Sequence, residues 1–259
     1  MQNQLKIAII QSNLIWEQPE LNRKNFSLKI KDIEASVDLI ILPEMFNSGF
    51  TMNPKNVFET MNGKTVGWMK ELAILYGVAI CGSLVIHENN HFYNRFVFVS
   101  SEGYLNIYDK RHTFTLAGEN KVYKPGEDRV IINYKNWKLM PLICYDLRFP
   151  VWSRNTDNYD VMLYVANWPK PRINAWDTLL KARAIENMSF CVGVNRVGFD
   201  NNNHEYPGHS AVYDGLGTRI LSTKANQEQT EIVVLEKQHL KSIRQNYKFL
   251  DDKDLFILK

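Results

Sequence analysis

The stretch LMPLICYDLRFP at residues 139–150 joins an apolar run to a polar and basic turn. Residues 139–143 are short, continuous and apolar, which indicates a buried strand. Cys144 follows this strand directly. The strand would hold the thiol rigidly, the turn would expose it, and a helix after it would point backbone N–H groups at it. Cysteine is also among the most often buried residue types, so a space-filling role for Cys144 is the alternative.

Two other segments repeat this local pattern. Leu42-Pro43-Glu44 and Tyr108-Asp109-Lys110-Arg111 each place a reactive side chain at the end of a strand-like run. Strand ends in layered α/β proteins converge on one edge, where sites usually form. There a thiol attacks, a carboxylate moves protons, and an ammonium with the Tyr145 backbone N–H stabilises an oxyanion. Singly, Glu44 also fits an exposed strand end, and Lys110 a solvated charge.

Composition narrows the class of protein. The 259 residues include 31 basic and 28 acidic side chains, a net charge of +3, which disfavours nucleic-acid binding. The three cysteines follow apolar residues and form no disulfide framework, so we expect a cytoplasmic protein with Cys81 and Cys191 in the core. No run approaches the ~20 apolar residues of a membrane-spanning helix.

Strand-like and helix-like runs alternate without a linker or repeat. They predict one domain over residues 1–259 in which helices cover packed sheets of mixed strand order. The expected hairpin turn at 134–136 and the loop tip at 200–203 lie between strands. Strands are predicted at 5–11, 38–44, 78–87, 92–100, 105–110, 129–133, 137–143, 160–167, 189–197, 211–214, 219–222 and 231–235, and helices at 20–34, 63–76 and 173–187, with an amphipathic segment around 240–247.

The motifs together resemble a known family. LPEMF at 42–46, YDKRH at 108–112 and ICYDLRFP at 143–150 resemble the three signature segments of the nitrilase (carbon–nitrogen hydrolase) superfamily, in the family's order. The similarity runs along essentially the whole chain and is greatest to its bacterial omega-amidase branch. The stretches similar to that branch are PEMFNSGF at 43–50, YDKRHTF at 108–114, CYDLRFPVWSRN at 144–155, YVANWPKPR at 164–172, KARAIEN at 181–187, NRVG at 195–198 and the Gly-His-Ser segment at 208–210.

The resemblance implies a four-layer α-β-β-α sandwich and a triad that works without a cofactor or metal. Carried onto this chain, Cys144 is the nucleophile, Glu44 the general base and acid, and Lys110 the electrostatic stabiliser. Glu119 stands where the family has a second, supporting glutamate, although by itself it reads as an exposed loop residue between Gly118 and Asn120. The resemblance also implies homodimers or higher oligomers that pack through helices near the nucleophile.

The implied reaction is hydrolysis of a terminal carboxamide through a thioester, with a small 2-oxo dicarboxylic acid monoamide such as 2-oxoglutaramate or 2-oxosuccinamate as substrate. Its distal carboxylate needs a cationic partner. We expect Arg172 in this role and Arg148 as a brace of the turn after the nucleophile. Phe46, Phe114 and Trp168 are predicted pocket walls, although aromatic residues beside strands also fill cores.

The sequence is also compatible with two other functions. The nearest is another amidase of the superfamily, such as an N-carbamoyl amidohydrolase, and a more distant one is a catalytically idle scaffold that binds a partner protein. His204 and His209 are five residues apart without a Cys/His cluster, so metal binding there is not expected. No nucleic-acid or membrane partner is expected.

Overall fold

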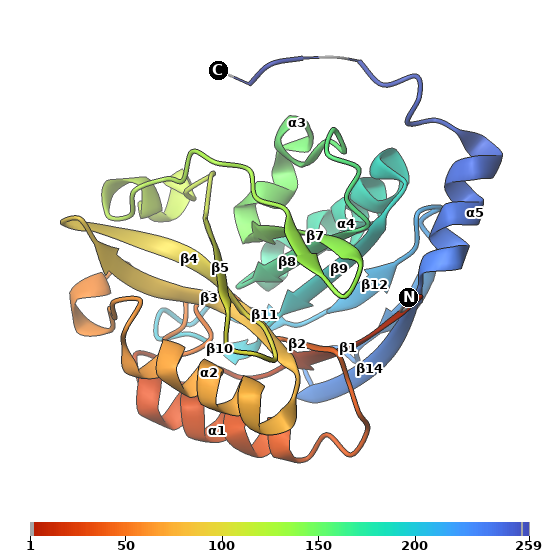
Figure 1. The fold of residues 1–259 in the computed structure, drawn as a ribbon. Coiled ribbons are helices and arrows are strands. Elements are labelled where there is room, and N and C mark those ends of the chain that lie inside the picture. Colours follow the sequence, from red (N-terminus) through yellow and green to blue (C-terminus); the bar gives the residue numbers. More distant parts are fainter. Residues whose placement is uncertain (1–2, 255, 259) are drawn as a thin grey trace.

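The chain forms two six-stranded sheets that pack face to face, as a computed structural model describing residues 3–254 and 256–258 shows (Figure 1). The first sheet has the order β14-β1-β2-β3-β4-β5 and the second β13-β12-β9-β8-β7-β6. The strands of the first sheet are β1 (Gln4–Gln11), β2 (Leu39–Ile41), β3 (Ala79–Glu88), β4 (His91–Val99), β5 (Leu105–Asp109) and β14 (Gln229–Glu236). Those of the second are β6 (Ile132–Tyr134), β7 (Trp137–Ile143), β8 (Val161–Ala166), β9 (Phe190–Asn195), β12 (Ala211–Tyr213) and β13 (Arg219–Ser222).

Both sheets follow the same plan. Three parallel strands, β1-β2-β3 in one sheet and β7-β8-β9 in the other, are flanked by antiparallel strands. The mixed strand order expected from hairpins and helical crossovers is therefore confirmed. The parallel strands β2, β7 and β8 direct their carboxyl ends to one region, where the chain leaves the sheets.

Helices cover the outer faces. Helices α1 (Pro19–Lys31) and α2 (Lys64–Tyr76) pack on the first sheet, and α3 (Pro150–Ser153) and α4 (Ile173–Asn187) lie over the second (Figure 1). Helix α5 (Lys237–Tyr247) follows β14. The predicted α-β-β-α sandwich is confirmed. Within residues 3–254 and 256–258, every helix is too short or too polar to cross a membrane.

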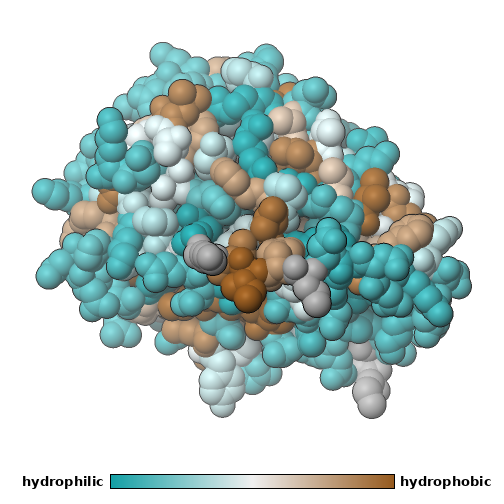
Figure 2. All heavy atoms as spheres, turned by 90° about the horizontal axis from the view of Figure 1, so that it is seen from above, coloured by the Kyte–Doolittle hydropathy of each residue, from teal (hydrophilic) through white to brown (hydrophobic). Residues whose placement is uncertain are grey.

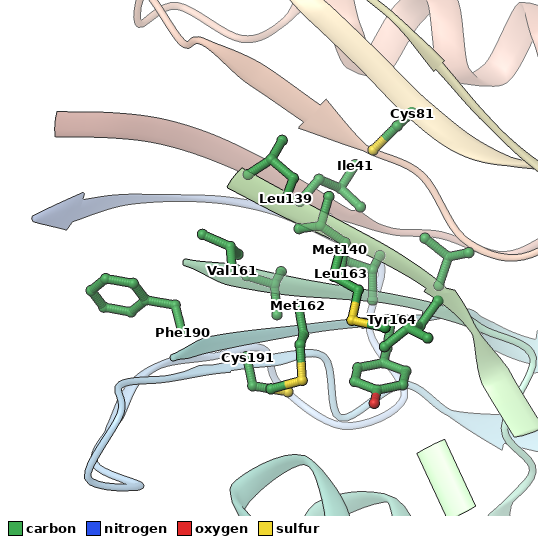
Figure 3. Packing of buried hydrophobic residues seen from close by; sticks show 14 of the residues in the cluster. Ile41, Cys81, Leu139, Met140, Val161, Met162, Leu163, Tyr164, Phe190 and Cys191 are labelled. Carbon is green, nitrogen blue, oxygen red and sulfur yellow. The ribbon is translucent and has the colours of Figure 1, made fainter. Parts of the chain in front are cut away.

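The apolar strands are continuous because both of their faces are covered. In β1, Leu5, Ile7 and Ile9 belong to the cluster between the sheets, whereas Ala8 and Ile10 face α1 and α2. Figure 3 shows part of this cluster, to which the first sheet contributes Ile41 and Cys81 and which continues on the other side of the second sheet to Trp176 and Leu180 of α4. Cys81 and Cys191 are fully buried, as expected.

Some strand boundaries differ from the sequence prediction. The run 38–44 is a regular strand only over Leu39–Ile41, because Pro43 offers no N–H and the chain turns away there. The strand predicted at 129–133 begins only at Ile132. Its hairpin turn has two residues rather than three, Lys135 and Asn136, both with the positive φ that such turns require.

A small hairpin escaped the prediction. The strand expected at 189–197 ends at Asn195, and β10 (Val197–Phe199) then pairs with β11 (Glu205–Pro207). Arg196 lies between β9 and β10, and its buried guanidinium donates hydrogen bonds to the backbone oxygens of Leu14, Val197 and Phe199. This side chain fixes where the hairpin leaves the second sheet. The predicted loop tip at 200–203 is the turn of this hairpin.

Candidate active site

Glu44 lies just beyond β2 and is completely buried. Its Oε1 accepts hydrogen bonds from Lys110 Nζ and from Asn94 Nδ2, both at 2.8 Å, and its Oε2 accepts one from the Asn167 backbone N–H at 2.8 Å. Met45, the next residue, has a φ of 43°, in the left-handed region that side chains with a Cβ rarely occupy. Glu44 is therefore fixed inside the protein, and the exposed-strand-end alternative is wrong.

Lys110 follows β5 directly and is 1% exposed. Its Nζ lies 2.8 Å from Glu44 Oε1 and 2.9 Å from Glu119 Oε2. Burial alone would lower the pKa of Lys110, but the carboxylates of Glu119 and Glu44 outweigh it and raise the pKa above its ordinary value. The Lys110 ammonium is therefore held in its charged form inside the protein. The alternative that it is a solvated surface charge is wrong.

Glu119 is completely buried, at the start of a 3₁₀ turn over Glu119–Lys121. Besides Lys110, its carboxylate accepts hydrogen bonds from the Phe114 backbone N–H at 2.5 Å and from Asn94 Nδ2 at 3.1 Å. Burial raises the pKa of Glu119, and the negative charge of Glu44 raises it further. The Lys110 ammonium lowers the pKa, but by less than these two effects raise it. The plain reading of Glu119 as an exposed loop residue is wrong, and the residue ties the segment after β5 to Lys110.

Cys144 begins a 3₁₀ turn over Cys144–Arg148, and its own φ is 44°. A non-glycine residue in this conformation costs about 1–3 kcal/mol and persists where the surrounding structure enforces it. Its Sγ lies 3.9 Å from the Asn167 carbonyl oxygen. The strand-end position expected from the sequence is confirmed.

A lysine and a helix N-terminus near a cysteine usually favour the thiolate, and the sequence suggests both for Cys144. The structure points in the opposite direction. Burial raises the pKa of Cys144 well above its ordinary value, and Glu44 and Glu119 add to the rise, whereas Lys110 alone among the named charges opposes it. These surroundings therefore favour the neutral thiol of Cys144 over the thiolate. Attack by its sulfur requires a base that removes the proton during the reaction.

A cavity of about 460 Å³ opens above Cys144 and collects most of the predicted site residues. The predicted residues in its lining are Lys110, Phe114, Cys144, Tyr145, Trp168 and Arg172. Phe50, Asn167 and Tyr206 also line it. Of these, Tyr206 belongs to β11, so the hairpin missed by the sequence analysis forms one wall.

Phe46 lies elsewhere. Its ring packs 5.5 Å from that of Phe26 and 5.9 Å from that of Trp68, in the core between the first sheet and its helices. The residue is completely buried and is not part of the cavity lining. The structure thus places Phe46 in the core, the alternative that holds for many aromatic residues beside strands.

Two arginines line the cavity with their guanidinium groups on aromatic rings. Arg172 lies 5.0 Å above the Phe114 ring, and Arg148 lies 5.0 Å above the Trp168 ring. Trp168 Nε1 also donates to the Arg172 carbonyl oxygen at 2.7 Å. Within residues 3–254 and 256–258, neither guanidinium has a hydrogen bond or a carboxylate partner. Arg148, expected to brace the turn, instead faces the cavity.

Two asparagines of the site were not foreseen. Asn94 is a polar residue in the middle of the apolar strand β4, and Ser83 Oγ donates to its Oδ1 at 2.8 Å, which orients its amide toward Glu44 and Glu119. Asn167 follows β8 and binds Glu44 through both its backbone and side-chain nitrogens. The signal for Asn167 was present, because it ends a strand-like run just as Glu44, Lys110 and Cys144 do.

A metal-binding arrangement is not seen in the described part of the chain, where no three His, Cys, Asp or Glu side chains group suitably. The His204 imidazole binds Asp200, and His209 binds Asp177. These pairs hold loops together. The buried charges and the thiol at the cavity floor are instead suited to acyl transfer at an electrophilic carbon.

Comparison with known proteins identifies the family. The model of the carbon–nitrogen hydrolase family matches residues 6–245. The chain therefore belongs to the carbon–nitrogen hydrolases, which agrees with the resemblance in the three motif segments.

Individual relatives extend along the whole chain. The omega-amidase YafV of Escherichia coli K12 is 41% identical over 254 residues, covering 98% of both proteins. The 2-oxoglutaramate amidase of Bacillus subtilis is 31% identical, covering 96% of this chain and 98% of that protein. The crystal structure of XC1258 from Xanthomonas campestris, a CN-hydrolase superfamily protein with an arsenic adduct in its active site, superposes with a TM-score of 0.97 at 37% identity, with both chains fully covered.

Proposed function

We propose that this protein is an omega-amidase, which hydrolyses the terminal carboxamide of 2-oxo dicarboxylic acid monoamides to the dicarboxylate and ammonia. The full-length similarity to an omega-amidase and to a 2-oxoglutaramate amidase supports the substrate class. The observation that carries the chemistry is the buried ion cluster of Glu44, Lys110 and Glu119, whose Lys110 lines the floor of the cavity together with Cys144.

The first half-reaction forms a thioester. Cys144 Sγ attacks the amide carbon while Glu44 takes the thiol proton, because the surroundings of Cys144 favour its neutral form. Charge develops on the amide oxygen, and the Lys110 ammonium with the Tyr145 backbone N–H stabilises it. Glu44 then gives the proton to the nitrogen, the C–N bond breaks, and ammonia leaves.

The second half-reaction releases the acid. Glu44 takes a proton from a water molecule, whose oxygen attacks the thioester carbon. The C–S bond breaks, the protonated Glu44 returns its proton to the sulfur, and the acid departs and ionises in solvent. Glu119 supports both halves without touching the substrate, because it holds the Lys110 ammonium and the Phe114 backbone in place.

The cavity arginines supply a site for the substrate carboxylate. Arg172 is the proposed anchor, and the placement of Arg148 in the same lining makes it a second donor. Guanidinium groups bind carboxylates in a planar, two-pronged geometry, and the aromatic rings of Phe114 and Trp168 hold these two in position. Tyr145 contacts Phe114 at a ring separation of 4.9 Å and completes the aromatic wall.

Ammonia release from a panel of amides tests the proposal. The panel contains 2-oxoglutaramate, 2-oxosuccinamate, succinamate, an N-carbamoyl amino acid and a nitrile, with Cys144→Ala as the control protein. We expect fast, Cys144-dependent turnover of the two oxo-acid amides. Preferred turnover of the N-carbamoyl compound would move the substrate to the N-carbamoyl amidohydrolases, and silence on the entire panel would favour a binding scaffold.

We also propose a homodimer in the cytoplasm. Val151 of α3 and Ile185 of α4 are 52% and 45% exposed, on the side of the molecule that carries the nucleophile turn. Figure 2 shows the face seen from above in Figure 1, where a patch of apolar side chains gathers near the C-terminal end of the chain. Light scattering after size-exclusion chromatography should give twice the chain mass of 30.2 kDa; the mass of a single chain would contradict the dimer.

A further inference from the structure

The carboxylate of Asp146 is completely buried between the two strand ends that bear Lys110 and Cys144. Its Oδ2 accepts hydrogen bonds from the Ile143 backbone N–H at 3.0 Å and from the Tyr108 hydroxyl at 2.7 Å. Its Oδ1 accepts from the His112 backbone N–H at 3.0 Å, and His112 Nδ1 lies 2.8 Å from the same oxygen. One side chain thus gathers four hydrogen bonds from two separate elements.

These partners flank the two reactive residues. Tyr108 and His112 lie two residues before and after Lys110, at the end of β5 in the first sheet. Ile143 immediately precedes Cys144, at the end of β7 in the second sheet. Asp146 therefore links the first sheet to the second at the point where the ammonium and the thiol must meet.

The surrounding groups make this link rigid. The Tyr108 hydroxyl accepts hydrogen bonds from Trp152 Nε1 at 3.0 Å and from the Arg111 backbone N–H at 3.2 Å. The His112 ring stacks on Phe149, with 3.7 Å between the ring centres and 6° between the planes. Every rotatable group that contacts Asp146 is itself held by a second partner.

The contacts of Asp146 indicate a holding role, because its four hydrogen bonds come from the segments that carry Lys110 and Cys144. Neither Asp146 nor His112 is part of the cavity lining, whereas Lys110 and Cys144 both are. The Cys144 backbone is strained at a φ of 44°, and the hydrogen bond from the Ile143 N–H to Asp146 closes the turn that holds it.

We propose that Asp146 is a positioning residue that sets the placement of the Cys144 thiol relative to the Lys110 ammonium across the two sheets. The expected change in kcat rests on the proposed amide hydrolysis. The expected change in the rate of Cys144 alkylation does not depend on it. Misplacement of a reacting group by about 1 Å can cost about 100-fold in rate. A loss of the link should therefore lower kcat much more than it changes KM.

The substitution Asp146→Asn weakens this link between the sheets while keeping a side chain of nearly the same size. The amide replaces one carboxylate oxygen by an NH₂ donor, and each oxygen of Asp146 faces a backbone N–H, that of Ile143 or that of His112. In either orientation of the amide, one backbone N–H therefore faces another donor and loses its acceptor.

Asp160→Asn is the matched control. Asp160 is also buried and accepts a backbone hydrogen bond, from Lys138 at 2.9 Å, but at the opposite end of β7. It also pairs with Lys237 and Arg244. The control therefore reports what loss of a buried carboxylate does to the protein away from the site.

The experiment measures kcat and KM for 2-oxoglutaramate, and the rate of Cys144 alkylation by iodoacetamide, per folded molecule. For Asp146→Asn we expect kcat to fall about 10- to 100-fold with KM changed less than about twofold, and the alkylation rate to change at least about fivefold. Asp160→Asn should lose stability yet keep both rates. Equal kcat and alkylation rates in the two variants would overturn the proposal.

Tyr108→Phe provides a milder break, in case Asp146→Asn does not fold. It removes one of the four donors and should lower kcat and alter alkylation by a few-fold. Wild-type values of both in this variant would overturn the link. If the wild-type protein hydrolyses none of the amides, the proposed function fails, while the alkylation rates still decide the role of Asp146.

Discussion

The floor and the wall of the cavity are built on opposite principles. At the floor, Lys110 lines the cavity and already donates hydrogen bonds of 2.8–3.0 Å to Glu44 and Glu119, which are buried beneath it. On the wall, the guanidinium groups of Arg148 and Arg172 rest on aromatic rings and, within the described residues, have no carboxylate partner. The difference indicates a division of labour, in which the floor is preorganised for chemistry and the wall receives the charge of the substrate.

The largest effect is expected at the nucleophile. Cys144→Ala removes the atom that forms the thioester, and loss of a nucleophile of this kind costs at least about 10⁴-fold in kcat. The fold should be unchanged, because the side chain contributes no hydrogen bond to the buried cluster other than the weak contact to Asn167. Ammonia release measured with the melting temperature checks both points, and activity above a thousandth of the wild-type rate would contradict the assignment.

The next effect separates a floor charge from a surface charge. Lys110→Met leaves Glu44 and Glu119 buried without their cation, which should cost about 3–5 kcal/mol of unfolding free energy and about 10²- to 10³-fold in kcat. Lys29→Met removes a lysine that pairs with Glu228 at the surface, and should cost at most about 1 kcal/mol. Urea denaturation of both variants measures the contrast; similar losses would show that the floor is not preorganised.

A smaller effect concerns the thiol itself. Because burial and two carboxylates raise the pKa of Cys144, the thiolate fraction stays low until the pH exceeds that raised value. Alkylation by iodoacetamide should therefore keep accelerating above pH ~8.5, where an ordinary cysteine levels off. Mass spectrometry of the labelled Cys144 peptide gives the rate, with buried Cys81 as an unreactive reference. A plateau below pH 7 would mean that Lys110 dominates the thiol.

The smallest effect concerns Asp200, which lines the cavity and accepts a hydrogen bond from Tyr206. Burial would raise the pKa of Asp200, but hydrogen bonds from the His204 backbone, Tyr206 and the His204 ring outweigh it and lower the pKa. A carboxyl whose pKa is lower in the folded state stabilises the protein above its unfolded pKa of about 3.9, and this contribution is lost as the pH falls through the folded value. Asp200→Asn should thus lower the melting temperature by a few degrees at pH 7 and by less at pH 3.5. An equal loss at both pH values would contradict this.

The sequence predicted the layered fold and the three reactive strand ends because these depend on local pattern. Continuous apolar runs before Glu44 and Cys144, and the strand-like run LNIYD before Lys110, indicate strands and their exits. The placement of Phe46 depends on which face of a turn points inward, and the pattern contains no such information.

Other parts of the site depend on contacts between distant segments. Glu119 is buried because its loop folds back onto Lys110, and Asn94 matters because it faces two carboxylates from other segments. The hairpin of β10 and β11 is set by Arg196, whose buried guanidinium reaches the Leu14 carbonyl. Local periodicity does not carry such long-range pairings, and only a family resemblance pointed to Glu119.

The most direct test of the division between floor and wall is the ratio of kcat/KM for 2-oxoglutaramate to that for a neutral amide of the same chain length. In the Arg148→Gln/Arg172→Gln variant, loss of charged hydrogen bonds should reduce this ratio about 10- to 100-fold, whereas Lys110→Met should lower both values and leave the ratio near that of the wild type. An unchanged ratio in the arginine variant would contradict the account.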